Sequence, residues 1–288
     1  MMRWYRSLWL GGAVAWIAAS GTVSQRAAAA LVPCPLSSGV AICQVGDGDS
    51  VLEVRATSLS GGAVSSVLRI GGVTDLPFEA FKVYSFDVDD FIDVVVESAM
   101  QDAAARQIRV QVREVESSAI RAVGVVTLDD TGPSSIVEET ITFTNLLAVP
   151  VNGRFYVITD LDLNGDAPDD TIAVSLAGTR IEQADGTTRA VIETTGDPPD
   201  AWDVAPCCDL SDIATGPVYR SLDDRTSVPG PADFQAAWSW DRQIGVGKSA
   251  VAAVRKTVTV PEPIAAATSA ASLAALLAIG SRRRGSLG

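Results

Sequence analysis

The 288-residue chain contains no histidine. Without an imidazole it cannot form Ser–His or Cys–His nucleophile pairs, a histidine general base, or the usual catalytic zinc site. Chemistry that needs only carboxylates, such as glycoside hydrolysis, survives this exclusion. Basic residues are scarce as well, with 22 Lys and Arg against 35 Asp and Glu, so the formal net charge is −13. Because a phosphate backbone attracts positive charge, no nucleic-acid partner is expected.

The first 30 residues have the three regions of a secretory signal peptide. Two arginines precede an uncharged run at Leu8–Ala19, and Ala28-Ala29-Ala30 places small residues at the −3 and −1 positions of a cleavage site. We therefore expect residues 1–30 to be a signal helix and the mature chain to start at Leu31. An uncleaved anchor is the alternative. No paired arginines precede the run, which favours the general secretory route.

The chain ends with three features in a fixed order. Pro261-Glu262-Pro263 comes first, and its prolines disfavour a helix, so this segment is predicted to be extended. Ile264–Gly280 follows without a charge; as a helix it would span roughly 25 Å, slightly short of a ~30 Å hydrocarbon core. Arg282-Arg283-Arg284 comes next and would hold the chain end in the cytoplasm. The alternative is an alanine-rich helix packed on the protein.

This order resembles the PEP-CTERM sorting signal of Gram-negative bacteria that make exopolysaccharide. The resemblance covers residues 260–288, about a tenth of the chain, and concerns destination and processing. It implies an exosortase as a partner, a membrane-embedded cysteine transpeptidase that acts at the Pro-Glu-Pro segment. The inner membrane would hold the precursor transiently through the C-terminal transmembrane helix. The expected destination is the cell surface or the extracellular matrix.

Residues 31–259, between the two signals, are predicted to form one secreted domain. Apolar and polar residues alternate most clearly in Gln107–Val115, which is typical of a half-buried strand in an antiparallel sheet. Further alternating or short apolar runs are Val51–Ala56, Ala63–Ile70, Phe91–Glu97, Ile120–Leu128, Glu138–Thr144, Arg154–Thr159, Ile172–Leu176, Phe234–Trp240 and Ala250–Val260. Gly- and Asp-rich turns separate these runs. The sequence therefore predicts an all-β fold, an antiparallel β-sandwich of jelly-roll or immunoglobulin-like type.

Three stretches carry more specific expectations. Ser98–Arg106 is the only plausible helix of the domain. Gly196–Pro231 is rich in Pro, Asp and Gly and is predicted to be a long loop. The last two strands, Phe234–Trp240 and Ala250–Val260, are expected to form a closing hairpin.

Four cysteines, Cys34, Cys43, Cys207 and Cys208, would be oxidised after export. A bond between the neighbours Cys207 and Cys208 is strained. The sequence therefore favours the two crossed arrangements, in which Cys34 and Cys43 each bond one of the later pair. The alternative is a Cys34–Cys43 bond together with a Cys207–Cys208 bond.

Only one segment has the spacing of metal ligands. Asp160-Leu-Asp162-Leu-Asn164-Gly165-Asp166-Ala-Pro-Asp169-Asp170 resembles the first half of a calcium loop of the EF-hand or related Asp-x-Asp-x-Asn-Gly type. The resemblance implies side-chain oxygens from Asp160, Asp162 and Asn164, and a backbone carbonyl from Asp166. The twelfth position is Thr171 instead of glutamate, so Asp169 or Asp170 would close the site. We expect a structural calcium ion; the alternative is a solvated Asn-Gly turn that binds nothing.

Other acidic and aromatic residues are weaker candidates. The acids Asp87, Asp89, Asp90 and Asp93 and the pair Asp129-Asp130 have the chemistry of metal ligands or catalytic carboxylates, but solvated strand ends explain them equally well. Trp202 is a candidate for stacking on sugars, whereas Trp238 and Trp240 share an apolar strand face and are expected in the core.

The sequence as a whole predicts an exported, non-enzymatic β-sandwich protein of the cell surface or matrix, with exopolysaccharide as a candidate partner. One alternative is a carbohydrate-binding module that uses an exposed tryptophan such as Trp202. The other is a glycosidase or lyase that uses a pair of carboxylates facing one cleft.

Overall fold

The structure is a computed structural model. It describes residues 31–37, 40–57, 63–70, 74–76, 78–87, 90–91, 93–115, 120–160, 163, 170–175, 177–206, 209–210, 213, 221–228 and 230–260. The signal peptide, the sorting motif Pro261-Glu262-Pro263, the apolar run Ile264–Gly280 and Arg282-Arg283-Arg284 lie outside these residues. In the part of the chain that is described, no helix has the length and apolar character that a bilayer span requires.

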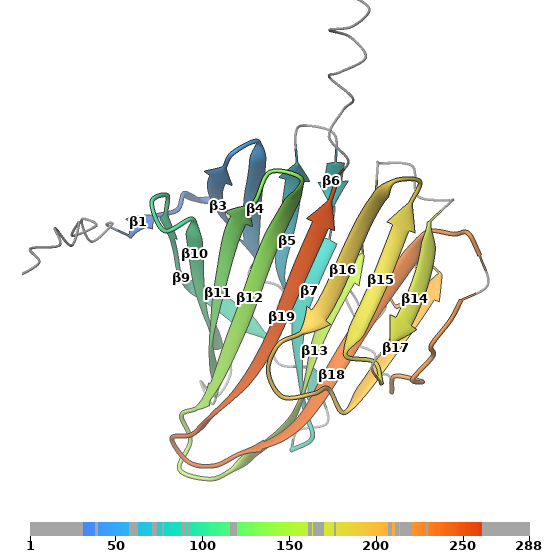
Figure 1. Cartoon of the computed structure of the whole chain (residues 1–288). Coiled ribbons are helices and arrows are strands. Elements are labelled where there is room, and N and C mark those ends of the chain that lie inside the picture. The colour runs from blue at the N-terminus through green and yellow to red at the C-terminus, as the bar shows by residue number, and fades with distance from the viewer. Residues whose placement is uncertain are drawn as a thin grey trace, which may run out of the picture.

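One layer of the fold is an antiparallel sheet of nine strands. In spatial order these are β1 (Val32–Pro33), β9 (Val94–Asp102), β10 (Gln107–Glu114), β11 (Ile120–Asp130), β12 (Ser134–Asn145), β19 (Ser249–Thr259), β16 (Thr188–Thr194), β15 (Arg180–Asp185) and β14 (Thr171–Ser175). β19 pairs with β12 on one side and β16 on the other, so it joins two runs of consecutive strands. Figure 1 shows this sheet across the front of the molecule, with β14 at one edge.

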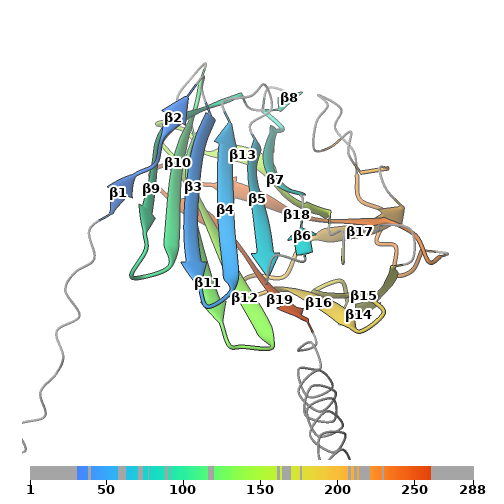
Figure 2. The ribbon, with the colours of Figure 1, turned by 90° about the horizontal axis from the view of Figure 1, so that it is seen from above.

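The second layer consists of two five-stranded sheets. The first contains β2 (Leu36–Ser37), β3 (Val40–Asp47), β4 (Ser50–Thr57), β5 (Ala63–Ile70) and β6 (Thr74–Leu76). The second, in spatial order, contains β17 (Ala201–Pro206), β18 (Phe234–Ile244), β13 (Val151–Asp160), β7 (Phe78–Ser85) and β8 (Asp90–Phe91). β5 lies beside β7 (Figure 2), so the two sheets form one layer. The predicted all-β, antiparallel architecture is confirmed; the jelly-roll or immunoglobulin-like subtype stays a prediction.

A single core fills the space between the layers. The period-two pattern explains it, because Ile108, Val110 and Val112 of β10 are all buried. Phe143 and Phe155 meet across the two layers with ring centroids 4.1 Å apart. Each apolar side chain of this size contributes about 1.5–3 kcal/mol when it is fully buried. The core therefore depends on residues from both ends of the chain.

Asn145 ties together two connections that cross between the layers. Its amide nitrogen donates to the carbonyl oxygens of Val149 at 2.8 Å and Ile244 at 2.9 Å. Its side-chain oxygen accepts the Leu147 N–H at 2.8 Å, and its own N–H donates to the Lys248 carbonyl at 3.0 Å. These contacts join the β12–β13 and β18–β19 connections. The expected closing hairpin is therefore wrong, since β18 and β19 lie in different layers.

The predicted helix at Ser98–Arg106 is also wrong. β9 continues to Asp102. The Asp102 carboxylate accepts hydrogen bonds from the N–H groups of Ala104 and Ala105 in the turn toward β10. Helix propensities differ by only tenths of a kcal/mol between most residues. Pairing with β10 outweighs them, because it satisfies the β9 backbone and buries Val96 and Ala99.

The long loop predicted at Gly196–Pro231 contains a strand, β17. Residues beyond it cover the outer face of the second layer, where Leu210, Ile213 and Leu222 pack with Tyr156, Ile158, Ala205 and Ala237. The Arg225 guanidinium holds this cover in place with hydrogen bonds of 2.6 and 2.8 Å to the fully buried Asp203 carboxylate. The Asp203 carboxylate raises the pKa of Arg225 above its ordinary value.

The disulfide connectivity corrects the favoured expectation. Cys34 bonds Cys43, with Cα atoms 5.2 Å apart, inside the range that a disulfide requires. The bond joins the segment after β1 to β3, because the antiparallel pairing of β2 with β3 brings the two residues together. The crossed arrangements are therefore wrong. Cys207 and Cys208 lie outside the described residues.

Candidate functional site

A shallow hollow of about 280 Å³ lies on the outer face of β14, β15 and β16. Cross-strand pairing places three rows of side chains on this face: Thr171–Ala184–Arg189, Ala173–Glu182–Val191 and Ser175–Arg180–Glu193. The alternate positions point the other way, and Ile181, Gln183 and Ile192 are accordingly buried. The hollow lies at the edge of the nine-stranded sheet that β14 forms, and we call it the β14–β16 hollow.

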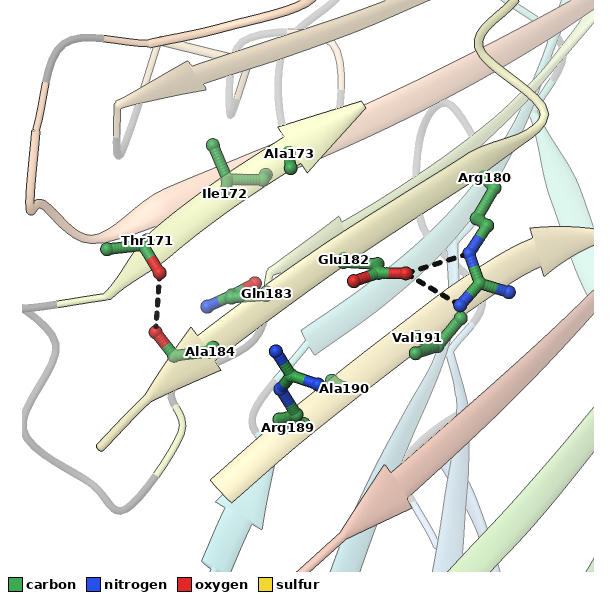
Figure 3. A pocket seen from close by; sticks show the side chains of 10 residues that line it. All are labelled: Thr171, Ile172, Ala173, Arg180, Glu182, Gln183, Ala184, Arg189, Ala190 and Val191. Carbon is green, nitrogen blue, oxygen red and sulfur yellow. Dashed lines mark hydrogen bonds and ion pairs between the residues drawn. The ribbon is translucent and has the colours of Figure 1, made fainter. Parts of the chain in front are cut away.

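Short side chains produce this hollow. Glu182 lies in the middle row of this face between Ala173 and Val191, and Ala184 lies between Thr171 and Arg189. Figure 3 shows the Arg180–Glu182 pair at one end and Thr171 at the other. The result is a floor of small apolar side chains interrupted by Glu182, with Arg180 and Arg189 at its ends, an arrangement that suits a ligand with both apolar and polar surface.

The two arginines of the hollow differ in their partners. Arg180 donates to Glu182 Oε1 at 3.0 and 2.6 Å and also pairs with Glu193. These hydrogen bonds raise the pKa of Arg180 above its ordinary value, and the bond that Glu182 accepts has the largest effect. Arg189 is exposed and has no ion pair or hydrogen bond from its side chain to any described residue. The Arg189 guanidinium is therefore available to a ligand.

The predicted calcium loop joins β13 to β14, and only its ends and the fully buried Leu163 are described. Asp160 is the last residue of β13, paired with Gln235. Asp170 is fully buried before β14, and its carboxylate accepts a hydrogen bond from the Gln183 amide. Asp162, Asn164, Asp166 and Asp169 lie outside the described residues. Among the residues that the structure does describe, no group of three or more Asp, Glu or Cys side chains is arranged to hold a metal ion, and calcium stays a prediction.

Other acidic candidates form hydrogen bonds or ion pairs with backbone and side-chain groups of the fold. Asp87 accepts the N–H of Asn152 at 2.8 Å and its amide group at 3.0 Å, which lowers the pKa of Asp87. Asp129 lies 3.2 Å from Arg106, and Asp130 accepts the Gly132 N–H at 2.7 Å. These contacts favour structural roles at strand ends.

Asp90 belongs to the short strand β8. The Asp93 carbonyl accepts the Val115 N–H at 2.9 Å. Asp89 lies outside the described residues.

Trp202 is partly buried and packs against the core. A Cβ added at Gly178 would lie 2.0 Å from the Trp202 ring, so the indole lies directly on this glycine. Trp202 as an exposed platform for sugar stacking is therefore wrong. Trp238 and Trp240 are buried as predicted, and Trp238 donates its N–H to the Gly178 carbonyl at 2.7 Å.

Sequence reasoning missed the β14–β16 hollow. Arg180–Asp185 and Thr188–Thr194 were not recognised as strands, because Gln183 and Asp185 occupy buried positions where an apolar residue would signal a strand. The Asp185-Gly186 turn that joins them was visible. Arg189, Ala173 and Ala184 come from three different strands, so no local sequence pattern marks the hollow that they line.

No family model and no curated protein matches the chain. Among solved structures, a heparinase III with methylated lysines is similar at a TM-score of 0.42 and 8% identity, over 78% of this chain and 34% of that one. This chain thus spans about a third of the length of that protein. A likeness at this level carries no argument about function.

Proposed function

We propose that the chain is the precursor of an exported β-sandwich protein with no catalytic activity of its own. An exosortase would process it at Pro261-Glu262-Pro263, and its destination would be the cell surface or the exopolysaccharide matrix of a Gram-negative bacterium. The observation that carries this proposal is the order of the C-terminal features: the Pro-Glu-Pro motif, the uncharged run Ile264–Gly280 and the three arginines.

The position where the described fold ends supports the proposal. β19 ends at Thr259, and the Val260 N–H donates to the Pro133 carbonyl at 3.1 Å. Pro261 follows directly. Every strand that the structure describes therefore precedes the motif, so cleavage at the motif would remove none of them.

Processing is tested in a host with an active exosortase. Mass spectrometry of the exported protein should find an N-terminus near Leu31 and no residues beyond the Pro-Glu-Pro region. A variant with Pro261, Glu262 and Pro263 changed to alanine should keep its full C-terminus, whereas Lys248→Ala, in the exposed turn before β19, should be processed normally. A mature protein that retains Arg282-Arg283-Arg284 in that host would overturn the proposal.

A carbohydrate-binding module of the matrix is the alternative that a structural observation favours. That observation is the β14–β16 hollow with its free Arg189, and it replaces the tryptophan on which this alternative first depended. A carboxylate-pair glycosidase or lyase is the other alternative. Release of new reducing ends or unsaturated sugars from matrix polysaccharide by the purified protein would replace the non-catalytic proposal with this one.

A further inference from the structure

We propose that the β14–β16 hollow binds one carboxylated sugar unit of an acidic polysaccharide, with the Arg189 guanidinium on the sugar carboxylate. This inference rests on the proposed function in that it gives the matrix protein a ligand. Its structural basis is the hollow itself, which lies in the folded domain and does not include the sorting signal.

Arg189 and Arg109 differ from the other arginines of the outer face, which pair with carboxylates, and only Arg189 of the two lines the hollow. Arg113 and Arg121 pair with Glu97 at 2.8 and 3.2 Å, and Arg255 pairs with Glu138. Acids outnumber bases by 35 to 22 in this chain, so an arginine without a carboxylate is not the default. Within the described residues, the exposed Arg189 lacks such a partner and also lines a hollow. A planar guanidinium binds a carboxylate through two parallel hydrogen bonds, which makes a carboxylate its natural ligand.

Glu182 supplies a second and different group. Both hydrogen bonds from Arg180 reach Glu182 Oε1, and no described residue donates to Oε2. This oxygen is therefore able to accept hydrogen bonds from hydroxyl groups. A sugar acid carries both kinds of group on one ring, a carboxylate for Arg189 and hydroxyls for Glu182.

The floor of the hollow matches the remaining face of such a ring. Ala173, Ala184 and Val191 present methyl groups between the charged side chains, and the C–H face of a pyranose is apolar. The volume of about 280 Å³ is just below the ~300–1,000 Å³ of sites for drug-sized molecules. A site of this size suits one ring, and the polymer can continue past the edge strand β14.

The charge that favours an anionic ligand is that of Arg189 itself. Arg180 pairs with both Glu182 and Glu193, so the two arginines and two glutamates of this face carry no net charge together. The rest of the acidic protein would repel the ligand, but ionic strength of ~0.15 M limits this repulsion to a range of about 8 Å. Inorganic phosphate offers no hydroxyl pattern for Glu182 and no apolar face for the alanines, so it is expected to bind less well than a sugar acid.

The test is a calorimetric titration of the full chain, purified in mild detergent, with a glucuronate trimer at ~0.15 M salt. A neutral glucose trimer and inorganic phosphate are the comparison ligands. The matched variants are Arg189→Gln and Arg109→Gln, because Arg109 is exposed on the same face and has no ion-pair partner among the described residues, yet lies outside the hollow. Unfolding midpoints of both variants should equal that of the unchanged protein.

We expect saturable binding of the acidic trimer that Arg189→Gln weakens by about tenfold or more, the loss expected for a charged hydrogen-bonded contact. Arg109→Gln should leave it unchanged, and phosphate should not compete. The proposal is overturned by an absence of binding, by equal binding of the neutral trimer, by equal loss in both variants, or by full competition from phosphate, which would identify a general anion site. Normal processing without sugar binding would reject this inference alone, whereas sugar binding by an unprocessed protein would reject only the sorting proposal.

Discussion

Changing Asn145 to alanine should destabilise the whole sandwich, although this residue lies far from any proposed ligand site. Asn145 is fully buried at the point where two connections cross between the layers. Its side chain makes hydrogen bonds of 2.8, 2.9 and 2.8 Å to Val149, Ile244 and Leu147. At about 1 kcal/mol each, their loss lowers the free energy of unfolding by about 3 kcal/mol.

Two further variants separate this mechanism from a general effect of substitution. Asn145→Asp has nearly the same size, but an ionised carboxylate only accepts hydrogen bonds, so it would face the carbonyl oxygens of Val149 and Ile244. It should destabilise at least as much as alanine. Thr144→Ala removes an exposed contact of 2.9 Å to Ser249 and should cost less than ~0.5 kcal/mol.

Urea denaturation of the full chain measures these differences through the unfolding midpoint and the slope of the transition. Hydrogen exchange at the Leu147 amide adds a local measurement, because its acceptor is the Asn145 side chain. A loss of less than ~1 kcal/mol in Asn145→Ala, with unchanged exchange at Leu147, would refute the claim that Asn145 holds the two connections together.

Three other predictions concern charged groups. Calcium at ~5 mM should raise the melting temperature of the unchanged protein but not that of Asp162→Ala, since binding only to the folded state stabilises it; an equal response in both would dismiss the predicted loop. Arg225→Met leaves the buried Asp203 carboxylate without its guanidinium, and because Arg225 is 32% exposed, we expect a loss of about 2–3 kcal/mol in urea unfolding, with partial recovery on adding Asp203→Asn. Hydrogen bonds from Asn152 lower the pKa of Asp87, so its stabilisation is present above the ordinary pKa of about 4 and is lost as pH falls through the lowered folded value. Asp87→Asn should therefore flatten the acid limb of a stability-against-pH curve, and an unchanged limb would contradict this assignment.

The all-β architecture could be predicted because its signal is local. Ala63–Ile70 was predicted with the bounds of β5, and Gln107–Val115 differs from β10 by one residue. Alternation with a period of two records which side chains face the core, whatever sheet the strand joins. Trp238 and Trp240 were assigned to the core for the same reason.

Strands whose buried positions are polar escaped prediction. The inward-facing residues of β15 include Gln183 and Asp185, whose buried side chains remove the apolar half of the pattern. Ala99 in β9 and Ala103–Ala105 just after it have high helix propensity, yet pairing of β9 with β10 decided the structure. Local propensity is worth tenths of a kcal/mol per residue, so partners from elsewhere in the chain override it.

The sequence by itself determined the alternating strands, the exclusion of histidine chemistry and the expected export and sorting signals, because each depends on residues that are neighbours in the chain. Tertiary structure decided which layer each strand joins, the Cys34–Cys43 bond and the β14–β16 hollow. Arg189 acquires its significance only because β15 places Ala184 beside it and no described carboxylate pairs with it. Such a site depends on cross-strand register, and register is set by the packing of a whole sheet face against the opposite layer.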